Sequence, residues 1–365
     1  MANSKLRGAL IGYGWIARHG HVPHYQATDE VTLVAVADPV LACRTQAAHD
    51  FPGIRCYNDA ASLLAAEKDL DFVDICTPPC WHAEYAIAAL EQGLHVLCEK
   101  PLATSTAQAT AMLQAAEKAG KVLLPCHTYK HAPVVRAVRK LLDEDRIGKV
   151  HLVTLQTFRN THAKGIPDWN TDWRREFRYS GGGIAMDHGS HTFYLAFDWL
   201  GALPTSVTAQ MTAQGNWDTE DAYSCTATFP NGGLAMAQLT WTAGIRRVYY
   251  TIHGERGAIT VQDDDVELCI KGEALAGGNG TVTWSYEKIA CPSDWMDASH
   301  CGWFGSLFAK FQATIASGQA VSSELEQAWT CVHLIESSYK SAQASSLAQP
   351  LAPVAQVRGA VAGGR

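Results

Sequence analysis

Three residues in this sequence, Lys100, Asp187 and His191, have side chains suited to acid–base chemistry. Lys100 lies in the run Glu99-Lys100-Pro101, where the following proline disfavours helical geometry and favours an extended lysine. Asp187 and His191 are four residues apart in a stretch that predicts a helix over 184–200, so they would share a face. That spacing suits a carboxylate steering a neutral imidazole as general base, and it also suits a metal pair. Alternatively, Lys100 could be an ordinary surface lysine, and Asp187 and His191 could each make only a polar contact between the domains.

A glycine-rich turn near the N-terminus indicates phosphate binding. Residues 12–17 read G-x-G-x-x-A directly after the apolar run Leu6–Ile11, which predicts a buried strand, and a helix should follow. Gly12 allows the tight turn, Gly14 lets the backbone approach a pyrophosphate, and Ala17 allows close packing of helix on strand. Main-chain N–H groups at the start of that helix would bind the anion.

An acidic residue, Asp38, ends the second predicted strand, 21 residues after Ala17. A carboxylate at this place accepts hydrogen bonds from a ribose hydroxyl and repels a 2′-phosphate. The sequence therefore favours NAD over NADP, although Arg44 lies six residues further on and could soften that preference.

The arrangement of elements must bring these residues together. The first 126 residues alternate short apolar runs with helical stretches, which predicts a parallel sheet with crossover helices. Beyond residue 150 several long strand candidates follow one another, and they predict a large, mainly antiparallel open sheet. Helices are expected over 184–200, 304–317 and 324–344.

We therefore expect an α/β protein in three parts. Residues 1–128 would form a dinucleotide-binding (Rossmann) domain, and residues 129–345 a substrate-binding and oligomerisation α/β domain. Residues 346–365, rich in Ala, Gly, Pro and Gln, would form a flexible tail. A sheet with one open face needs cover, so a homodimer or homotetramer is expected.

Composition excludes several classes of protein. The net charge of −7 argues against a nucleic-acid surface, and 47% hydrophobic residues indicate a chain that can bury a core. Eleven cysteines form no C-x-x-C pair, so neither a disulfide framework nor a structural zinc site is expected. The N-terminus has no long apolar segment and no run of about 18 apolar residues occurs, which predicts a cytoplasmic protein without a membrane span.

Taken together, the motifs resemble the Gfo/Idh/MocA oxidoreductase family over about residues 5–345. They are G-x-G-x-x-A, Asp38, the run TPP-x-W-H at 77–82, GLHVLCEKPLA at 93–103 and GGG-x-x-x-D-x-x-x-H at 181–191. The resemblance implies a nicotinamide cofactor and substrates that are sugars, cyclitols or their derivatives. It implies a catalytic lysine at Lys100, with the family's carboxylate and histidine at Asp187 and His191.

The resemblance also implies a set of cofactor-binding residues. Those with main-chain or side-chain contacts to the cofactor would be Trp15, Ile16, Thr77, Pro78, His82, Glu99, Lys100, Trp173 and Arg174.

Residues on the substrate side of the cleft are harder to read. His127 and Tyr129 follow the sixth predicted strand into the domain junction, and Trp169 lies in a polar loop over 160–177, where it could pack on a sugar or merely anchor the loop. His162 and His188 could act in substrate binding or, with Asp187 and His191, as metal ligands. No metal is expected, because the spacing fits no familiar zinc motif and the family works without one.

Three functions compete. The first is an NAD(P)-dependent oxidoreductase that moves a hydride between the cofactor and a hydroxyl carbon of a sugar, sugar derivative or cyclitol. The second is an NAD-dependent glycosidase-type enzyme of the same fold, and the third is a non-catalytic sugar-sensing homologue. The last is disfavoured because Lys100, Asp187 and His191 are all present. The sequence leaves open the substrate, the reaction direction and which of Lys100 and His191 takes the proton.

Overall fold

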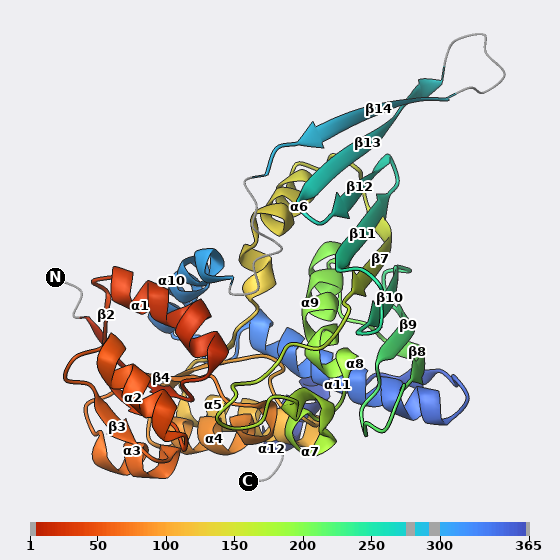
Figure 1. Ribbon diagram of the computed structural model, residues 1–365. Helices are drawn as coiled ribbons and strands as arrows, with labels where there is room; N and C mark the ends of the chain where they lie inside the picture. Colours follow the sequence, from red (N-terminus) through yellow and green to blue (C-terminus); the bar gives the residue numbers. More distant parts are fainter. Residues whose placement is uncertain (1–4, 275–281, 292–299, 363–365) are drawn as a thin grey trace.

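The computed structural model describes residues 5–274, 282–291 and 300–362, and its N-terminal part is built on a parallel sheet. The six strands lie in the order β3-β2-β1-β4-β5-β6, which confirms the predicted Rossmann domain (Figure 1). The connections reverse direction between β1 and β4, and ligands bind at such a switch point. The strands are β1 (Leu6–Ile11), β2 (Val31–Ala37), β3 (Arg55–Tyr57), β4 (Phe72–Ile75), β5 (His95–Cys98) and β6 (Leu123–Pro125).

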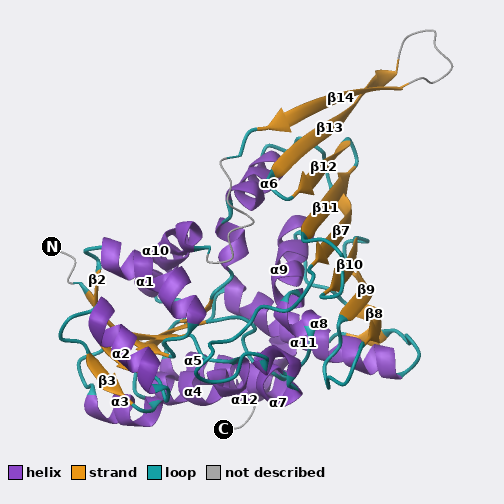
Figure 2. Ribbon diagram, in the orientation of Figure 1, coloured by secondary structure: helices purple, strands orange, loops and turns teal. Residues whose placement is uncertain are grey.

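Helices cover both faces of this sheet, as its mostly apolar and buried strands require (Figure 2). One face is covered by α1 (Val22–Ala27), α2 (Leu41–Asp50) and the distant helix α10 (Cys301–Ser317). The other is covered by α3 (Ala60–Ala66), α4 (His82–Glu91) and α5 (Thr106–Ala119).

The helix that follows the glycine-rich turn is irregular. It begins at Trp15, but Ala17–His21 form a π-helical turn before α1 continues to Ala27. A π turn inserts one extra residue into a helix and changes the direction of the side chains around it, and such turns are frequent at functional sites. Here the irregular turn carries His21 into the interior, where it is 1% exposed.

The second sheet has nine strands in the order β14-β13-β12-β11-β7-β10-β9-β8-β15. Only the pair β7 and β10 is parallel, so the predicted large and mainly antiparallel sheet is confirmed. Strands β14 and β15 were not expected from the sequence. The strands are β7 (Val150–Phe158), β8 (Ser206–Thr212), β9 (Ala222–Thr228), β10 (Leu234–Thr240), β11 (Arg247–Gly254), β12 (Gly257–Gln262), β13 (Asp265–Ala274), β14 (Val282–Ile289) and β15 (Gln349–Pro350).

Helices cover one face of the nine-stranded sheet, and Figure 1 shows β13 and β14 extending beyond them. Aromatic residues of α9, such as Phe193 and Phe197, pack on sheet residues such as Tyr223 and Phe229. The remaining helices are α6 (Pro133–Asp143), α7 (Phe177–Ser180), α8 (Ile184–Asp187), α9 (Gly189–Leu200), α11 (Ser323–Gln343) and α12 (Val354–Ala362), with short turns at Pro79–Trp81, Thr128–His131 and Trp173–Arg175.

Two predicted boundaries need correction. The single helix expected over 184–200 is divided at His188 into α8 and α9, because Gly189 starts a new helical segment. The segment expected to be a flexible tail has structure in its described part: β15 pairs with β8, Leu351 and Val354 are buried, and α12 contacts α11. The apolar side chains in that segment find a buried surface, which its Ala- and Gly-rich composition did not reveal.

Candidate active site

The glycine-rich turn forms a cradle at the carboxyl end of β1. Gly12 has φ +94°, and a Cβ atom there would lie 2.9 Å from the main-chain carbon of Cys76, so only glycine fits. A Cβ on Gly14 would meet no atom within 4 Å, so this residue faces open space. Since the helix starts at Trp15 directly beyond this space, the turn fits the pyrophosphate of a dinucleotide.

Asp38 lies at the tip of β2 with its carboxylate turned onto the same turn. Its oxygens accept hydrogen bonds from the main-chain N–H groups of Tyr13, at 2.7 Å, and Val40, at 2.8 Å. Burial raises the pKa of Asp38 although these two hydrogen bonds oppose the rise. Arg44 donates to the main-chain oxygens of Asp38 and Pro39. The carboxylate thus braces the cradle from the end of β2.

A cavity of about 970 Å³ opens between the carboxyl ends of the parallel strands and the second domain. It joins the cradle to the acid–base residues, so one ligand can reach both. The predicted site residues that line it are Gly12, Gly14, Trp15, Ile16, Asp38, Thr77, Pro78, Glu99, Lys100, Tyr129, His162, Trp169, Trp173, Arg174, Asp187, His188 and His191.

Three predicted site residues lie behind the cavity wall. Ala17 is fully buried in the helix, as its packing role requires. His82 is also fully buried, and its two ring nitrogens bond the main-chain oxygens of Thr77 and Pro101, so it ties together the two loops that do line the cavity. His127 is buried and stacks on Tyr194 with ring centroids 4.0 Å apart.

Lys100 and Asp187 meet across the domain junction. The ammonium group of Lys100 donates to a carboxylate oxygen and to the main-chain oxygen of Asp187, both at 3.0 Å. Arg174 also approaches this carboxylate, with Nε 3.5 Å away. Burial raises the pKa of Asp187, but the charges of Lys100 and Arg174 outweigh burial and hold it well below its usual value. The carboxylate is therefore ionised and fixes Lys100 in the cavity wall.

His191 is buried and neutral. Its Nδ1 lies 2.7 Å from the Tyr194 hydroxyl, and its ring stacks on Tyr129 with centroids 3.7 Å apart. Burial, followed by the charge of Lys100, lowers the pKa of His191 well below its usual value. Because Tyr194 occupies Nδ1, Nε2 is the ring nitrogen that a ligand in the cavity can engage.

His188 occupies the break between α8 and α9, with Nε2 3.8 Å from a carboxylate oxygen of Asp187. Its pKa is lowered to about 3, chiefly by burial, which the attraction of Asp187 does not offset. It is therefore a neutral polar group in the cavity wall. In the part of the chain that the structure describes, His162, His188, His191 and Asp187 form no cluster with metal-ligand spacing.

Residues of the loop over 160–177 line the cavity. Trp169 packs against Trp81 and Tyr179, with ring centroids 5.8 and 5.3 Å away. The Arg174 guanidinium lies over the Trp173 ring at 4.1 Å. These contacts show that the tryptophans anchor the loop while still bordering the cavity.

His162 in the same loop is held on both sides. Its Nδ1 accepts a hydrogen bond from Arg175, and its Nε2 donates to Asp172 at 2.8 Å. Both ring nitrogens are therefore engaged within the protein, which favours a role in shaping the loop.

Several cavity residues were not singled out by the sequence. Trp81 belongs to the TPP-x-W-H motif, so the motif itself could have indicated it. Arg159 and Arg246 line the cavity from the ends of β7 and β11. No local pattern marks them, because they reach the cavity through the tertiary fold.

The fold and the site together define a nicotinamide-dependent oxidoreductase, with a dinucleotide cradle next to an acid–base group. Comparison with known families agrees: residues 6–127 match the model of the oxidoreductase family with an NAD-binding Rossmann fold, and residues 135–260 match the GFO/IDH/MocA C-terminal domain. The chain belongs to the Gfo/Idh/MocA oxidoreductase family, as its motifs predicted.

Its relatives act on sugars and cyclitols. The chain is 31% identical to D-glucoside 3-dehydrogenase of Escherichia coli K12 over 67% of this chain and 73% of that protein. It is 31% identical to 1,5-anhydro-D-fructose reductase of Ensifer adhaerens over 69% of this chain and 74% of that protein. A structure of levoglucosan dehydrogenase in complex with NADH matches with a TM-score of 0.80 and 22% identity, over 96% of this chain and all of that one.

Among the described residues, the structure has no helix that is long and apolar enough to cross a membrane.

Proposed function

We propose that this protein is an NAD-dependent dehydrogenase that transfers a hydride between nicotinamide and a hydroxyl carbon of a sugar, sugar derivative or cyclitol. The single observation that carries the proposal is the continuity of one cavity from the Gly12 cradle to Lys100, Asp187 and His191. The names of relatives support the substrate class, since they include D-glucoside 3-dehydrogenase, levoglucosan dehydrogenase and inositol 2-dehydrogenase.

The chain's own residues provide the proton chemistry. A nicotinamide cofactor held at the Gly12 cradle would supply the hydride chemistry. Lys100, held on Asp187, donates a hydrogen bond to the oxygen on the reacting carbon and stabilises its negative charge. Neutral His191 accepts the hydroxyl proton at Nε2. The burial that lowers the pKa of His191 makes its protonated form a strong acid, which suits proton return in the reverse direction.

The test is nicotinamide absorbance with a panel of glucosides, anhydrosugars, pentoses and inositols. Replacing Lys100 with Ala should lower kcat by about 100-fold or more, because the site loses its main donor to the reacting oxygen. Lys130→Ala is the matched control: its ammonium also pairs with an aspartate, Asp198, and its side chain is equally 16% exposed, but it does not line the cavity. No reduction of NAD by any member of the panel would refute the proposal.

A glycosidase-type reaction that uses NAD transiently is the alternative within this fold. It would release the aglycone of a glucoside without net formation of NADH, so both products should be measured in the same reaction. A non-catalytic sugar sensor would bind the ligands and release neither. The Lys100–Asp187 pair beside a neutral His191 supports the catalytic functions over the sensor.

NAD is the proposed cofactor, in preference to NADP. Asp38 supports this because an acidic residue at the end of the second strand of a dinucleotide-binding fold repels a 2′-phosphate, and Asp38 lines the cavity next to the cradle. Replacing Asp38 with Ser should raise the affinity for NADPH relative to NADH in a fluorescence titration. An unchanged ratio would count against this assignment.

We also propose a homodimer or homotetramer formed through the open face of the nine-stranded sheet. Leu234 and Met236 support it, since both point outward from β10 and are 39% and 44% exposed. Met236→Lys should weaken association. Gln238→Lys adds the same charge at the next outward-facing position of β10 without removing an apolar side chain, so it tests the effect of charge alone. Light scattering measures the mass, and a wild-type monomer would refute the proposal.

Buried free thiols, such as those of Cys43, Cys98 and Cys126, support a reducing, cytoplasmic location, which cell fractionation would test.

A further inference from the structure

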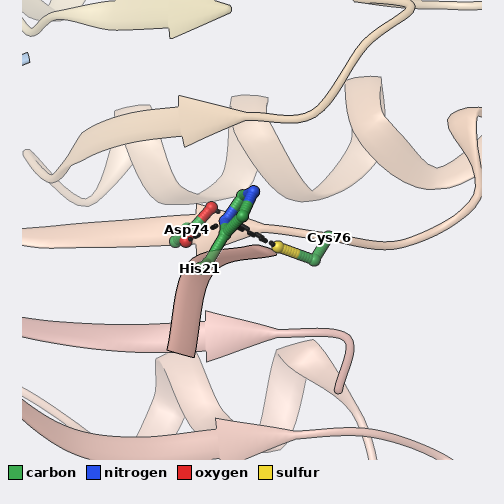
Figure 3. Close-up of side chains that lie close together, drawn as sticks. All are labelled: His21, Asp74 and Cys76. Atoms are coloured by element: carbon green, nitrogen blue, oxygen red, sulfur yellow. Dashed lines mark hydrogen bonds and ion pairs between the residues drawn. The ribbon is translucent and has the colours of Figure 1, made fainter. Parts of the chain in front are cut away.

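A buried cluster of charged side chains lies beneath the cavity wall. His21 contacts Asp74 through Nδ1 at 2.8 Å and Glu99 through Nε2 at 3.1 Å. The Cys76 sulfur also lies 3.3 Å from Nδ1, and Figure 3 shows the His21 ring between Asp74 and Cys76. Tyr25 donates a further hydrogen bond to Asp74 at 2.8 Å. None of the sequence motifs described above contains His21, Tyr25 or Asp74.

Four elements of the fold meet at this cluster. The π-helical turn carries His21 inward, β4 supplies Asp74, and Glu99 directly follows β5. Phe304 of α10 stacks on the imidazole with ring centroids 4.0 Å apart. Asp74 is fully buried and His21 is 1% exposed, so water does not compensate these charges. Burial at this depth is costly unless every charge is paired.

The geometry requires a doubly protonated imidazole. Ionised carboxylates only accept hydrogen bonds, and each ring nitrogen of His21 faces one, so both nitrogens must donate. Burial alone lowers the pKa of His21, but the charge of Asp74 outweighs it and raises the pKa well above its usual value. Burial likewise raises the pKa of Glu99, but the hydrogen bond from His21 outweighs it and lowers the pKa.

Glu99 connects this cluster to the active site. While Oε1 faces His21, Oε2 accepts a hydrogen bond at 3.0 Å from the main-chain N–H of Lys100. The Lys100 ammonium then reaches Asp187 on the other side of the cavity. A single carboxylate therefore links a buried cation to the main chain that carries the reacting lysine.

We propose that His21 is a positioning residue: it clamps Glu99, so that the Glu99–Lys100 turn holds the Lys100 ammonium on Asp187. This inference rests on the proposed dehydrogenase function, because it assigns a role within that site. His21 contacts neither substrate nor the reacting atoms and acts only through Glu99.

The same atoms also meet the spacing of a metal site, as the groups His21–Asp74–Cys76 and His21–Glu99–Cys126. The two groups use opposite nitrogens of one imidazole, so a single ion could take only one of them. Each carboxylate already accepts hydrogen bonds from the protein. These observations favour the clamp over a metal ion, and metal content is an outcome of the test below.

Two substitutions separate the two ends of the imidazole. In His21→Gln the amide nitrogen takes the place of Nε2 and keeps the bond to Glu99. In His21→Asn it takes the place of Nδ1, which keeps the bond to Asp74 and breaks the clamp. A lost hydrogen bond to a charged group predicts a fall in kcat of about tenfold or more for His21→Asn, with a smaller fall for His21→Gln. KM should change less than kcat in both.

A second readout does not depend on turnover. Brief acetylation of the full-length protein, with and without NADH, followed by peptide mass spectrometry, measures how firmly Lys100 is held relative to Lys130. The Lys100 labelling rate should rise in His21→Asn and stay near wild type in His21→Gln. If the wild type oxidises no sugar, the proposed function fails, while this labelling still decides the role of His21.

His95→Asn is the matched control, since His95 lies at the start of β5 and Glu99 follows its end. The control should leave Lys100 labelling unchanged even if it lowers the melting temperature. Equal effects of the two His21 variants on kcat and labelling would overturn the proposal, as would one bound metal ion per wild-type chain that both variants lose. If neither variant folds, Asp74→Asn replaces them: increased labelling supports the clamp, and wild-type labelling refutes it.

Discussion

The active-site residues differ in charge although they lie within one cavity wall. Lys100 and Asp187 form an ion pair, whereas His188 and His191 are both neutral because burial and nearby cations lower the pKa of each. The cavity thus offers one cationic donor to an oxygen and one neutral base. That combination suits removal of a proton from a hydroxyl group as a hydride leaves its carbon.

The state of His191 predicts the pH dependence of sugar oxidation. The pKa of its imidazole lies well below 6.5, so the neutral form persists as the pH falls through that value. We expect kcat/KM for oxidation to stay level between neutral pH and pH 6.5. It should fall only at lower pH, with the midpoint of that fall below 6.5. An acidic limb centred at or above 6.5 would show that His191 is not the proton acceptor.

At this scale the sequence predicted the residues that belong to motifs and missed those that do not. Lys100, Asp187 and His191 each lie in a recognisable run, and the structure brings all three to one cavity. His21 pairs with partners 53 and 78 positions away, and no local spacing connects them. Such a cluster is visible only once the strand order is known.

The elements followed the predicted pattern where burial gave a clear periodicity. The buried strand β1 was predicted over Leu6–Ile11, and the structure gives it the same bounds. β14 was missed although Val282–Glu287 alternate apolar and polar residues, and its side chains are largely exposed. The break at His188 and the π turn were also missed, since each is set by tertiary packing and not by residue propensity.

The turn after β1 offers a direct test at this scale. Gly12→Ala should lower the free energy of unfolding, since an alanine at positive φ costs about 1–2 kcal/mol and its Cβ would also meet Cys76. It should in addition weaken NADH binding, measured by fluorescence titration. Gly53→Ala is the control, with φ +89° and no atom near its Cβ. Equal NADH affinity in the two variants would contradict the cradle.

The two domains share elements across the whole molecule. The C-terminal helix α11 packs on the nucleotide domain, where Trp329 donates a hydrogen bond at 2.9 Å to Thr110 of α5, and it also lies against β8. Arg358 of α12 bridges Glu117 and Glu326, which come from the two halves of the chain. The predicted boundary at residue 128 therefore divides the sequence into two parts, but side chains from both parts pack against one another.

Removal of the C-terminal segment should show this sharing. A chain ending at Leu347 loses the pairing of β15 with β8 and the buried side chains of Leu351 and Val354. Burial of two such side chains predicts a loss of about 3 kcal/mol in the free energy of unfolding. Urea unfolding measures it, and unchanged stability would show that this segment is dispensable. NADH affinity should be unchanged, since none of these residues lines the cavity.

The position of α10 has a consequence for synthesis of the protein. Phe304, Phe308 and Phe311 complete the aromatic cluster around Tyr25 and Phe72, yet they lie far beyond β6, the last strand of the nucleotide domain, in the sequence. The nucleotide domain therefore emerges from the ribosome first and keeps an apolar face uncovered until α10 has been translated. A polypeptide interrupted before α10 would expose this apolar surface, and chaperones recognise surfaces of this kind.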